Sequence, residues 1–194
     1  MSPEQNPPQL RWRELSNAEL EREYSPSSAI GGDFSQYVEA YIARSEAART
    51  QCFNAGSTLI ELRYGSDVSQ SVDLVVPAAG VGPVPLLVFI HGGYWQLLSK
   101  RESFFAATAC LDQGIAFAAV DYTLAPTASL DEIVNECRRA LRLLGESATE
   151  YGYDQHRIFI AGSSAGAHLT AMAGLTSNES STTTLGFAPA GLIL

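Results

Sequence analysis

Residues 157–169 read RIFIAGSSAGAHL, and in this stretch an apolar run passes through a glycine-rich turn into a helical segment. Short apolar runs such as residues 157–161 are typical of strands that are covered on both faces of a sheet. The pentapeptide GSSAG that follows has the form G-x-S-x-G, in which the central serine occupies a sharp strand-to-helix turn and the glycines let neighbouring backbones approach. Glycine and serine also occur in ordinary turns, so the pattern alone leaves both interpretations open. Ser164 is the candidate nucleophile of the first interpretation.

Other segments predict the sheet around this turn. Two more nearly continuous apolar runs indicate parallel strands, helix-length segments separate the runs, and an earlier alternating pair indicates an antiparallel hairpin. The predicted fold class is therefore α/β: a mostly parallel sheet with an N-terminal antiparallel hairpin, in three αβα layers. The expected strands are residues 57–63, 71–76, 86–90, 115–120 and 157–161, and the expected helices are residues 102–113, 129–145 and 165–175.

The first residues of the chain have a different character. Residues 1–32 are polar and rich in Pro and Gly, and we expect them to form an N-terminal arm with one short helix at residues 17–23. Residues 33–194 form the predicted α/β domain. Asp33 is placed to cap a helix that buries one apolar stripe. The residues of this stripe are Phe34, Tyr37, Val38, Tyr41 and Ile42.

Composition limits the function. The 194 residues are 46% hydrophobic and carry a formal net charge of −9, which argues against disorder and against nucleic-acid binding. No run of 18 apolar residues is present, so we expect no membrane span. The N-terminus lacks the apolar core of a signal peptide, and the chain is expected to be cytoplasmic. Cys52, Cys110 and Cys137 are too sparse for a disulfide framework or a zinc site, so no metal is expected.

A second motif strengthens the interpretation of the serine turn. His91-Gly92-Gly93-Tyr94-Trp95 directly follows an apolar strand, at the edge of the sheet where ligands bind in open α/β folds. The N–H groups of Gly92 and Gly93, with the N–H of Ala165, would form an oxyanion hole. The alternative is a glycine turn with an aromatic cover.

Three motifs together resemble a known family. HGGYW (residues 91–95), VDYTLAP (residues 120–126) and GSSAGAHL (residues 162–169) resemble the α/β-hydrolase fold and, within it, the arylformamidase (kynurenine formamidase) and hormone-sensitive-lipase-like esterase branch. Esterases of this branch usually have a third glycine where this chain has Tyr94, which favours arylformamidase. Ser163 departs from the histidine that is often found there.

The resemblance implies a chemistry. Ser164 would attack N-formylkynurenine, or a related aryl formamide or ester, and the acyl-enzyme would then be hydrolysed without a metal or cofactor. His91 would brace the oxyanion loop, and Tyr94 and Trp95 would line or support the acyl and aromatic pocket.

The base and acid of a triad are harder to find. After Ser164 the chain has only His168, one helical turn along the same helix, and Glu179, which no histidine follows. His156 precedes the strand, and His91 has a better position but a structural role in the family. Residues 191–194 read as the opening of another buried strand. We therefore expect the chain to be a fragment that lacks the C-terminal strands and the loops with the Asp and His.

Two other functions stay open at this stage. A general carboxylesterase would favour short acyl esters over N-formylkynurenine, and a catalytically silent member of the fold would bind a small ligand without turnover. The expected partner is a small acyl or formamide substrate, and a homodimer is possible in either case.

Overall fold

The computed structural model describes residues 12–78, 82–174 and 185–194. The chain divides into two compact units, Met1–Glu39 and Ala40–Leu194, which are described separately. The division falls within helix α2 (Ser35–Asn54), while the sequence placed the end of the arm at residue 32. The arm and domain boundaries stay a prediction.

The smaller unit consists of short helices. Its 3-10 helices are η1 (Trp12–Glu14) and η2 (Pro26–Ile30), and its α-helix α1 (Asn17–Tyr24) confirms the helix predicted at residues 17–23. The Glu19 N–H donates to Ser16 Oγ at 3.3 Å, and the Ser16 N–H donates back to the Glu19 carboxylate at 2.8 Å. Since α1 buries none of its residues, this capping box is its main local support.

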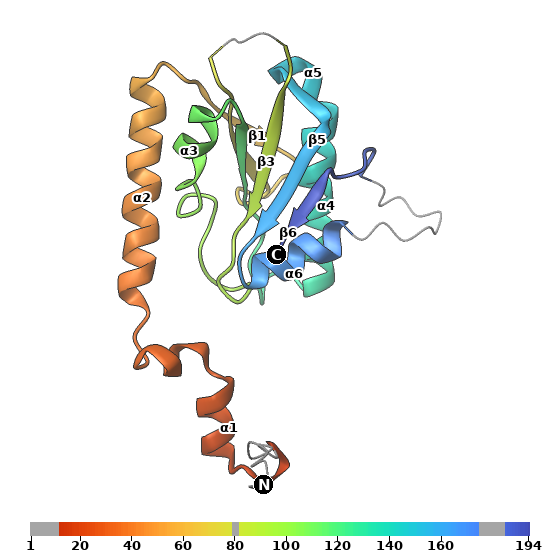
Figure 1. Ribbon diagram of the computed structural model, residues 1–194. Coiled ribbons are helices and arrows are strands. Elements are labelled where there is room, and N and C mark those ends of the chain that lie inside the picture. Colours follow the sequence, from red (N-terminus) through yellow and green to blue (C-terminus); the bar gives the residue numbers. More distant parts are fainter. Residues whose placement is uncertain (1–11, 79–81, 175–184) are drawn as a thin grey trace, which may run out of the picture. The chain divides into compact units, whose positions relative to one another are not determined.

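The larger unit is built on a six-stranded sheet with the order β1-β2-β4-β3-β5-β6 (Figure 1). The pairs β1–β2 and β2–β4 are antiparallel, and the pairs formed by β3, β4, β5 and β6 are parallel. The predicted α/β fold with a hairpin at its start is confirmed. The strands are β1 (Leu59–Arg63), β2 (Ser71–Val75), β3 (Val84–Ile90), β4 (Ala116–Val120), β5 (Tyr153–Gly162) and β6 (Gly191–Ile193).

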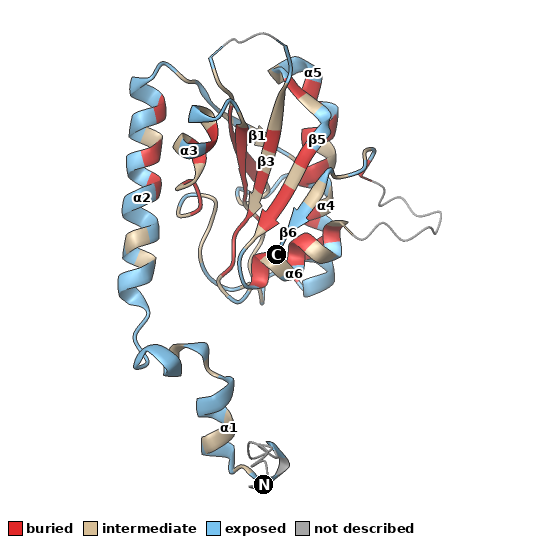
Figure 2. Ribbon diagram, viewed as in Figure 1, coloured by how far each residue is buried: buried red, intermediate tan, exposed pale blue. Residues whose placement is uncertain are grey.

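Helices cover both faces of this sheet (Figure 2). Along β4, Ala118 and Val120 join a core cluster with residues of α4 and α6, while Phe117 and Ala119 join a second cluster with residues of α2 and α3. This alternation explains why the run is apolar throughout, because both of its faces are buried. The remaining helices are α3 (Ala107–Asp112), α4 (Leu130–Glu146), α5 (Ala148–Tyr151) and α6 (Ala165–Gly174).

Helix α3 is shorter than predicted. The sequence indicated a helix from residue 102, but α3 begins at Ala107. The Phe104 N–H donates to Ser45 Oγ at 3.1 Å, and the Ser45 hydroxyl donates to the Glu102 carbonyl at 2.7 Å. A side chain of α2 therefore occupies the Glu102 carbonyl, which would accept an intrahelical hydrogen bond if the helix began at residue 102.

The apolar stripe predicted for α2 is not where this helix is buried. Asp33 does accept a hydrogen bond from the Ser35 N–H at 2.9 Å. Tyr41 and Ile42 remain more than one-third exposed, although the Tyr41 ring lies 5.2 Å from that of Phe105. The buried residues Ser45, Ala48 and Cys52 continue the face of Tyr41 toward the end of the helix. These side chains are small, so the helix can approach the sheet closely there, whereas an apolar pattern does not measure how close two backbones come.

Strand β6 forms where the sequence predicted a further strand, and it pairs in parallel with β5. Its other edge has no partner strand within the described part of the chain. Leu192, Ile193 and Leu194 are 41%, 55% and 70% exposed. Among the described helices, none has the length and apolar character needed to cross a membrane.

Candidate active site

The serine turn has the geometry of a nucleophile elbow. Ser164 lies between the end of β5 and the start of α6, has a φ of 56° and is exposed. A left-handed backbone is uncommon for a residue other than glycine, and such strain is found mostly at functional sites.

The glycines that flank this serine are needed for close approach. A Cβ on Gly166 would lie 2.6 Å from the carbonyl oxygen of His91 and would also meet that of Ile90. A Cβ on Gly162 would lie 2.6 Å from Thr170 Oγ1 and would also meet the Gly166 carbonyl. The turn is therefore pressed against the end of β3, which brings the second motif to the serine.

The HGGYW loop leaves β3 directly beside the elbow. A Cβ on Gly92 would lie 2.5 Å from the Ser163 carbonyl oxygen and 3.4 Å from Ser164 Cβ. Gly93, Tyr94 and Trp95 all have left-handed backbones, with φ of 93°, 55° and 59°, and the Leu97 N–H closes the turn on the Gly93 carbonyl at 2.9 Å. The predicted nucleophile and the predicted glycine donors are thus neighbours.

Buried side chains anchor this loop from beneath. His91 is 1% exposed, with its Nδ1 2.9 Å from the Gly92 carbonyl oxygen and its Nε2 3.3 Å from Asp121 Oδ1. Its ring stacks on Tyr122 with centroids 4.1 Å apart and an interplanar angle of 7°. The Tyr122 hydroxyl reaches the carbonyl oxygens of His91 and Gly92 at 3.0 and 3.3 Å. Burial raises the pKa of the Tyr122 phenol, so it stays a hydrogen-bond donor at neutral pH.

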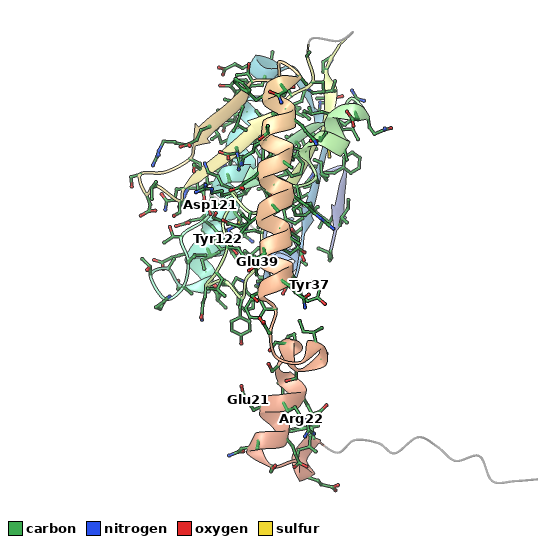
Figure 3. All side chains as sticks on the ribbon, turned by 90° about the vertical axis from the view of Figure 1, so that its left-hand side faces the viewer. Glu21, Arg22, Tyr37, Glu39, Asp121 and Tyr122 are labelled. Carbon is green, nitrogen blue, oxygen red and sulfur yellow. The ribbon has the colours of Figure 1, made fainter. Side chains whose placement is uncertain are left out.

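Asp121 and Tyr122 were not predicted as site residues. They follow the end of β4 directly and lie next to each other in the larger unit (Figure 3). The Asp121 carboxylate accepts the Tyr122 N–H at 3.1 Å, and the Tyr64 hydroxyl donates to the Asp121 carbonyl at 2.6 Å. The signal in the sequence was the VDYTLAP stretch, which contributed only to the resemblance.

The aromatic residues of the loop lie beside the elbow helix. Tyr94 is 72% exposed, and its ring packs against Trp95 with centroids 5.3 Å apart. Trp95 in turn meets His168 of α6 edge to face at 5.4 Å, and its carbonyl accepts the Ala125 N–H at 2.8 Å. Trp95 is thus built into the wall next to the serine, while Tyr94 is open to solvent.

The described residues do not arrange a histidine on the serine. Both ring nitrogens of His91 face acceptors other than Ser164, and His168 packs against Trp95. His156 lies in the first half of β5, away from the elbow, and its N–H donates to Asp154. Within the described part of the chain, no hydrogen bond joins a histidine to the Ser164 hydroxyl. The structure therefore brings the predicted nucleophile and the predicted donors together, and no histidine that could act as a base is among these contacts.

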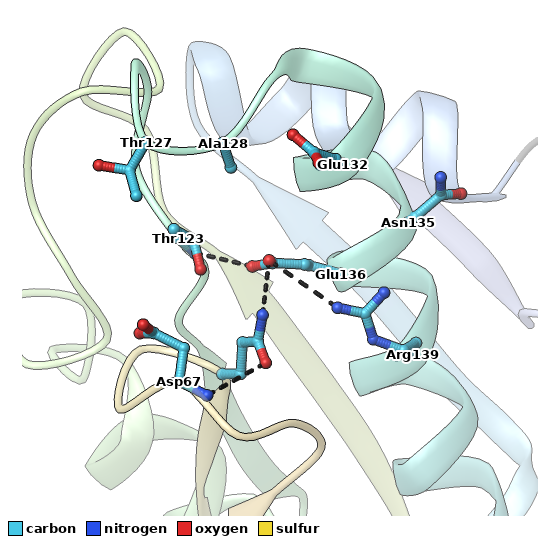
Figure 4. A pocket seen from close by; sticks show the side chains of 9 residues that line it. Asp67, Thr123, Thr127, Ala128, Glu132, Asn135, Glu136 and Arg139 are labelled. Carbon is cyan, nitrogen blue, oxygen red and sulfur yellow. Dashed lines mark hydrogen bonds and ion pairs between the residues drawn. The ribbon is translucent and has the colours of Figure 1, made fainter.

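A polar cavity of about 410 Å³ lies between α4, the β1–β2 turn and the loop after β4 (Figure 4). Glu136 organises it by accepting hydrogen bonds from Gln70 Nε2 at 2.7 Å and from the Thr123 N–H at 2.8 Å, with the Arg139 guanidinium 3.8 Å away. None of the predicted site residues lines this cavity. Its lining groups bond to one another, and these hydrogen bonds connect α4 to the β1–β2 turn and to the loop after β4.

No group of His, Cys, Asp or Glu suitable for a metal ion occurs among residues 12–78, 82–174 and 185–194. The three cysteines are free and buried, and burial raises the pKa of each thiol.

Comparison with known proteins defines the class. A kynurenine formamidase of Salmo salar is 32% identical over 165 residues, which are 84% of this chain and 54% of the relative. A Silicibacter sp. TM1040 protein that is proposed to be a thioesterase has a solved structure with a TM-score of 0.67 and 31% identity, over 80% of this chain and 55% of that one. A bacterial heroin esterase has a TM-score of 0.54 and 36% identity, over 61% of this chain and 38% of that one. The fold is that of an α/β-hydrolase of the arylformamidase and esterase type.

The family follows from a match to a family model. Residues 72–188, more than half of the chain, match the model of the BD-FAE family, and the chain belongs to this family. The matched part starts in β2 and includes both the HGGYW loop and the elbow. The chain spans about half the length of the curated relatives that it matches.

Proposed function

We propose that this protein is a serine hydrolase of arylformamidase type in which Ser164 is the nucleophile. The observation that carries the proposal is the left-handed Ser164 at a strand-to-helix turn, with the Gly92 backbone directly against it. The N–H groups of Gly92, Gly93 and Ala165 would stabilise the oxyanion. Similarity to a kynurenine formamidase supports an aryl formamide as the substrate.

The proposed reaction has two steps. Ser164 Oγ attacks the formyl carbonyl, the C–N bond breaks, and the arylamine leaves with the serine proton, so that a formyl ester remains on Ser164. Water then attacks this ester, and formate and the free serine result. The proton transfers need a general base, and the proposal assigns none of the described histidines to that role.

Labelling with a fluorophosphonate tests the nucleophile. We expect the probe to modify Ser164 and to lose its target in Ser164→Ala, because Ser164 is the one serine with a left-handed backbone among the described residues. Ser163→Ala is the matched control, since its side chain is adjacent and exposed, and it should still be labelled. Intact-protein mass spectrometry measures both results. Labelling that persists in Ser164→Ala would refute the assignment.

A second candidate is a general carboxylesterase, which the similarity to a bacterial heroin esterase favours. The two candidates differ in kcat/KM for N-formylkynurenine and for 4-nitrophenyl acetate. A higher value for the formamide supports the first proposal, and a higher value for the ester supports the second.

A third candidate is a ligand-binding protein without catalytic activity. The absence of a histidine contact to Ser164 among the described residues favours it. If fluorophosphonate did not label Ser164, that result would support this candidate.

The location is also a proposal. Three free, buried cysteines agree with a reducing compartment such as the cytoplasm. A small-molecule substrate is proposed as the partner, and a homodimer stays a prediction.

A further inference from the structure

Two backbone N–H groups of the HGGYW loop have no hydrogen-bond acceptor among the described residues. Among the described residues, neither the Gly92 N–H nor the Gly93 N–H makes a hydrogen bond. Both belong to the loop that touches Ser163 and Ser164. These N–H groups can bind an oxyanion only if they are held in the right direction.

The preceding carbonyls fix that direction. In a trans peptide the C=O of one residue and the N–H of the next lie in one plane and point in opposite directions. The His91 carbonyl therefore sets the direction of the Gly92 N–H, and the Gly92 carbonyl sets that of the Gly93 N–H. Glycine has no Cβ to restrict these planes, so they need an external anchor.

One side chain holds both carbonyls. The Tyr122 hydroxyl lies 3.0 Å from the His91 oxygen and 3.3 Å from the Gly92 oxygen, and its proton is shared between them. Tyr122 is fully buried, and its ring is fixed by the stacked His91 ring, whose Nδ1 also lies 2.9 Å from the Gly92 oxygen. The face of Gly92 where a Cβ would project is the face that meets the elbow.

We propose that Tyr122 is a positioning residue for the oxyanion hole: its hydroxyl holds the His91 and Gly92 carbonyls inward and so turns the Gly92 and Gly93 N–H groups toward Ser164. The inference rests on the proposed serine hydrolase function and adds to it. Tyr122 does not touch the substrate. Its effect on the reaction passes entirely through the two peptide planes.

Tyr122→Phe is the direct test because it removes the hydroxyl and keeps the ring that stacks on His91. We expect kcat to fall by about tenfold to a hundredfold with KM changed by less than about twofold, since misaligned donors act mainly on the transition state. Tyr153→Phe is the matched control. The buried Tyr153 hydroxyl also donates to a backbone carbonyl, that of Leu144 at 2.5 Å, but far from the loop. The kcat of the Tyr153→Phe variant should stay unchanged even if its melting temperature falls.

Thionoester substrates distinguish a positioning role of Tyr122 from a general loss of structure in the variant. Sulfur in place of the carbonyl oxygen is a weak acceptor, so a working oxyanion hole favours the oxygen ester over its thiono analogue. Tyr122→Phe should lower the rate for the oxygen ester more than that for the thionoester and so narrow their ratio. Equal losses for the two substrates would mean a structural role only and would overturn the proposal.

A third readout does not depend on turnover. In the 15N-labelled protein, the Gly92 and Gly93 amides should show lower order parameters in Tyr122→Phe than in the wild type, and no change in Tyr153→Phe. Unchanged order at both glycines would refute the positioning role even if the protein proved to be catalytically silent. A wild type that fails to turn over while these amides respond as expected would refute the proposed function alone.

Discussion

Backbone strain is concentrated in two short loops of this protein. Among the described residues, the non-glycine positions with positive φ are Tyr94, Trp95, Leu98 and Ser164. The first three lie in the HGGYW segment or just after it, and Ser164 lies at the elbow. A left-handed conformation costs about 1 kcal/mol or more for such residues, and it persists only where the surroundings enforce it. The two loops that share this strain also touch each other through Gly92.

Gly92→Ala tests that contact at the level of one methyl group. The new Cβ would lie 2.5 Å from the Ser163 carbonyl oxygen, so the loop and the elbow would have to separate. We expect kcat to fall by about a hundredfold or more, the cost of a displaced oxyanion donor. Steady-state kinetics on the preferred substrate measures the loss.

Gly114→Ala is the control for this prediction. Gly114 has a φ of 68°, and a Cβ at this position would meet no atom within 4 Å outside its chain neighbours, so alanine would cost stability through backbone strain alone. Its kcat should match that of the wild type. A Gly92→Ala protein with wild-type kcat would show that the loop does not need its close approach to the elbow.

Among the elements, α4 shows how local signals and packing combine. Ser129 and Glu132 form a capping box, with the Glu132 N–H bonded to Ser129 Oγ at 3.3 Å and the Ser129 N–H bonded to Glu132 Oε2 at 2.7 Å. The helix then buries one face against the sheet. The sequence predicted a helix at residues 129–145, and the structure has it at Leu130–Glu146. In α2, by contrast, small residues form the buried contact.

Ser129→Ala should destabilise the larger unit by about 1 kcal/mol, the usual cost of losing a serine cap. The hydrogen bonds from the Ser129 backbone and hydroxyl lower the pKa of Glu132. A lowered pKa in the folded state means that this contribution is present above the unfolded pKa of Glu132 and is lost as pH falls through the folded one. The difference between wild type and variant should therefore shrink in acid. Urea unfolding at several pH values measures it.

The chain contains a matched control in α1. Ser16 and Glu19 form the same capping box, but α1 buries no residue. Ser16→Ala should leave the unfolding of the sheet unchanged. An equal loss in both variants would mean that the cap of α4 does not act through the packing of that helix.

For the larger unit as a whole, a buried ion cluster joins segments that are distant in sequence. Asp73 of β2 lies 2.8 Å from Arg49 Nη1 of α2 and 2.7 Å from Lys100 Nζ of the loop after β3. The Arg49 guanidinium also lies over the Phe104 ring at 4.3 Å. One carboxylate thus pairs with two cations and holds a helix and a loop onto the same face of the sheet.

Asp73→Ala should lower the free energy of unfolding by about 2 kcal/mol, because both cations are partly buried and would lose their main partner. Glu61→Ala is the comparison. The Glu61 carboxylate also pairs with Lys100, at 3.3 Å, but it is half-exposed, and its loss should cost no more than about 1 kcal/mol. Urea midpoints at constant m-value measure both variants. Similar losses would show that burial does not set the strength of this cluster.

The fold and the serine turn could be predicted because they depend on short segments. An apolar run of five to seven residues identifies a strand covered on both faces, and GSSAG after such a run identifies the strand-to-helix turn at Ser164, since strand, turn and helix are neighbours in sequence. The HGGYW loop was predicted to face the elbow because the carboxyl ends of parallel strands share one edge of the sheet. The structure brings Gly92 and Ser164 together as that reasoning required.

The sequence by itself therefore determined the α/β class, the hairpin and the positions of the serine turn and of the glycine loop, since each depends on local pattern and chain direction. Only the tertiary structure decided that Tyr122 and Asp121 hold the loop, that Asp73 pairs with Arg49 and Lys100, and that α2 is buried at Ser45, Ala48 and Cys52 and not at Tyr41 and Ile42. The physical reason is that a hydrogen bond or ion pair between segments distant in sequence depends on positions that are fixed to a fraction of an ångström. Such positions are set by close packing of the whole unit, and no periodicity in the sequence records them.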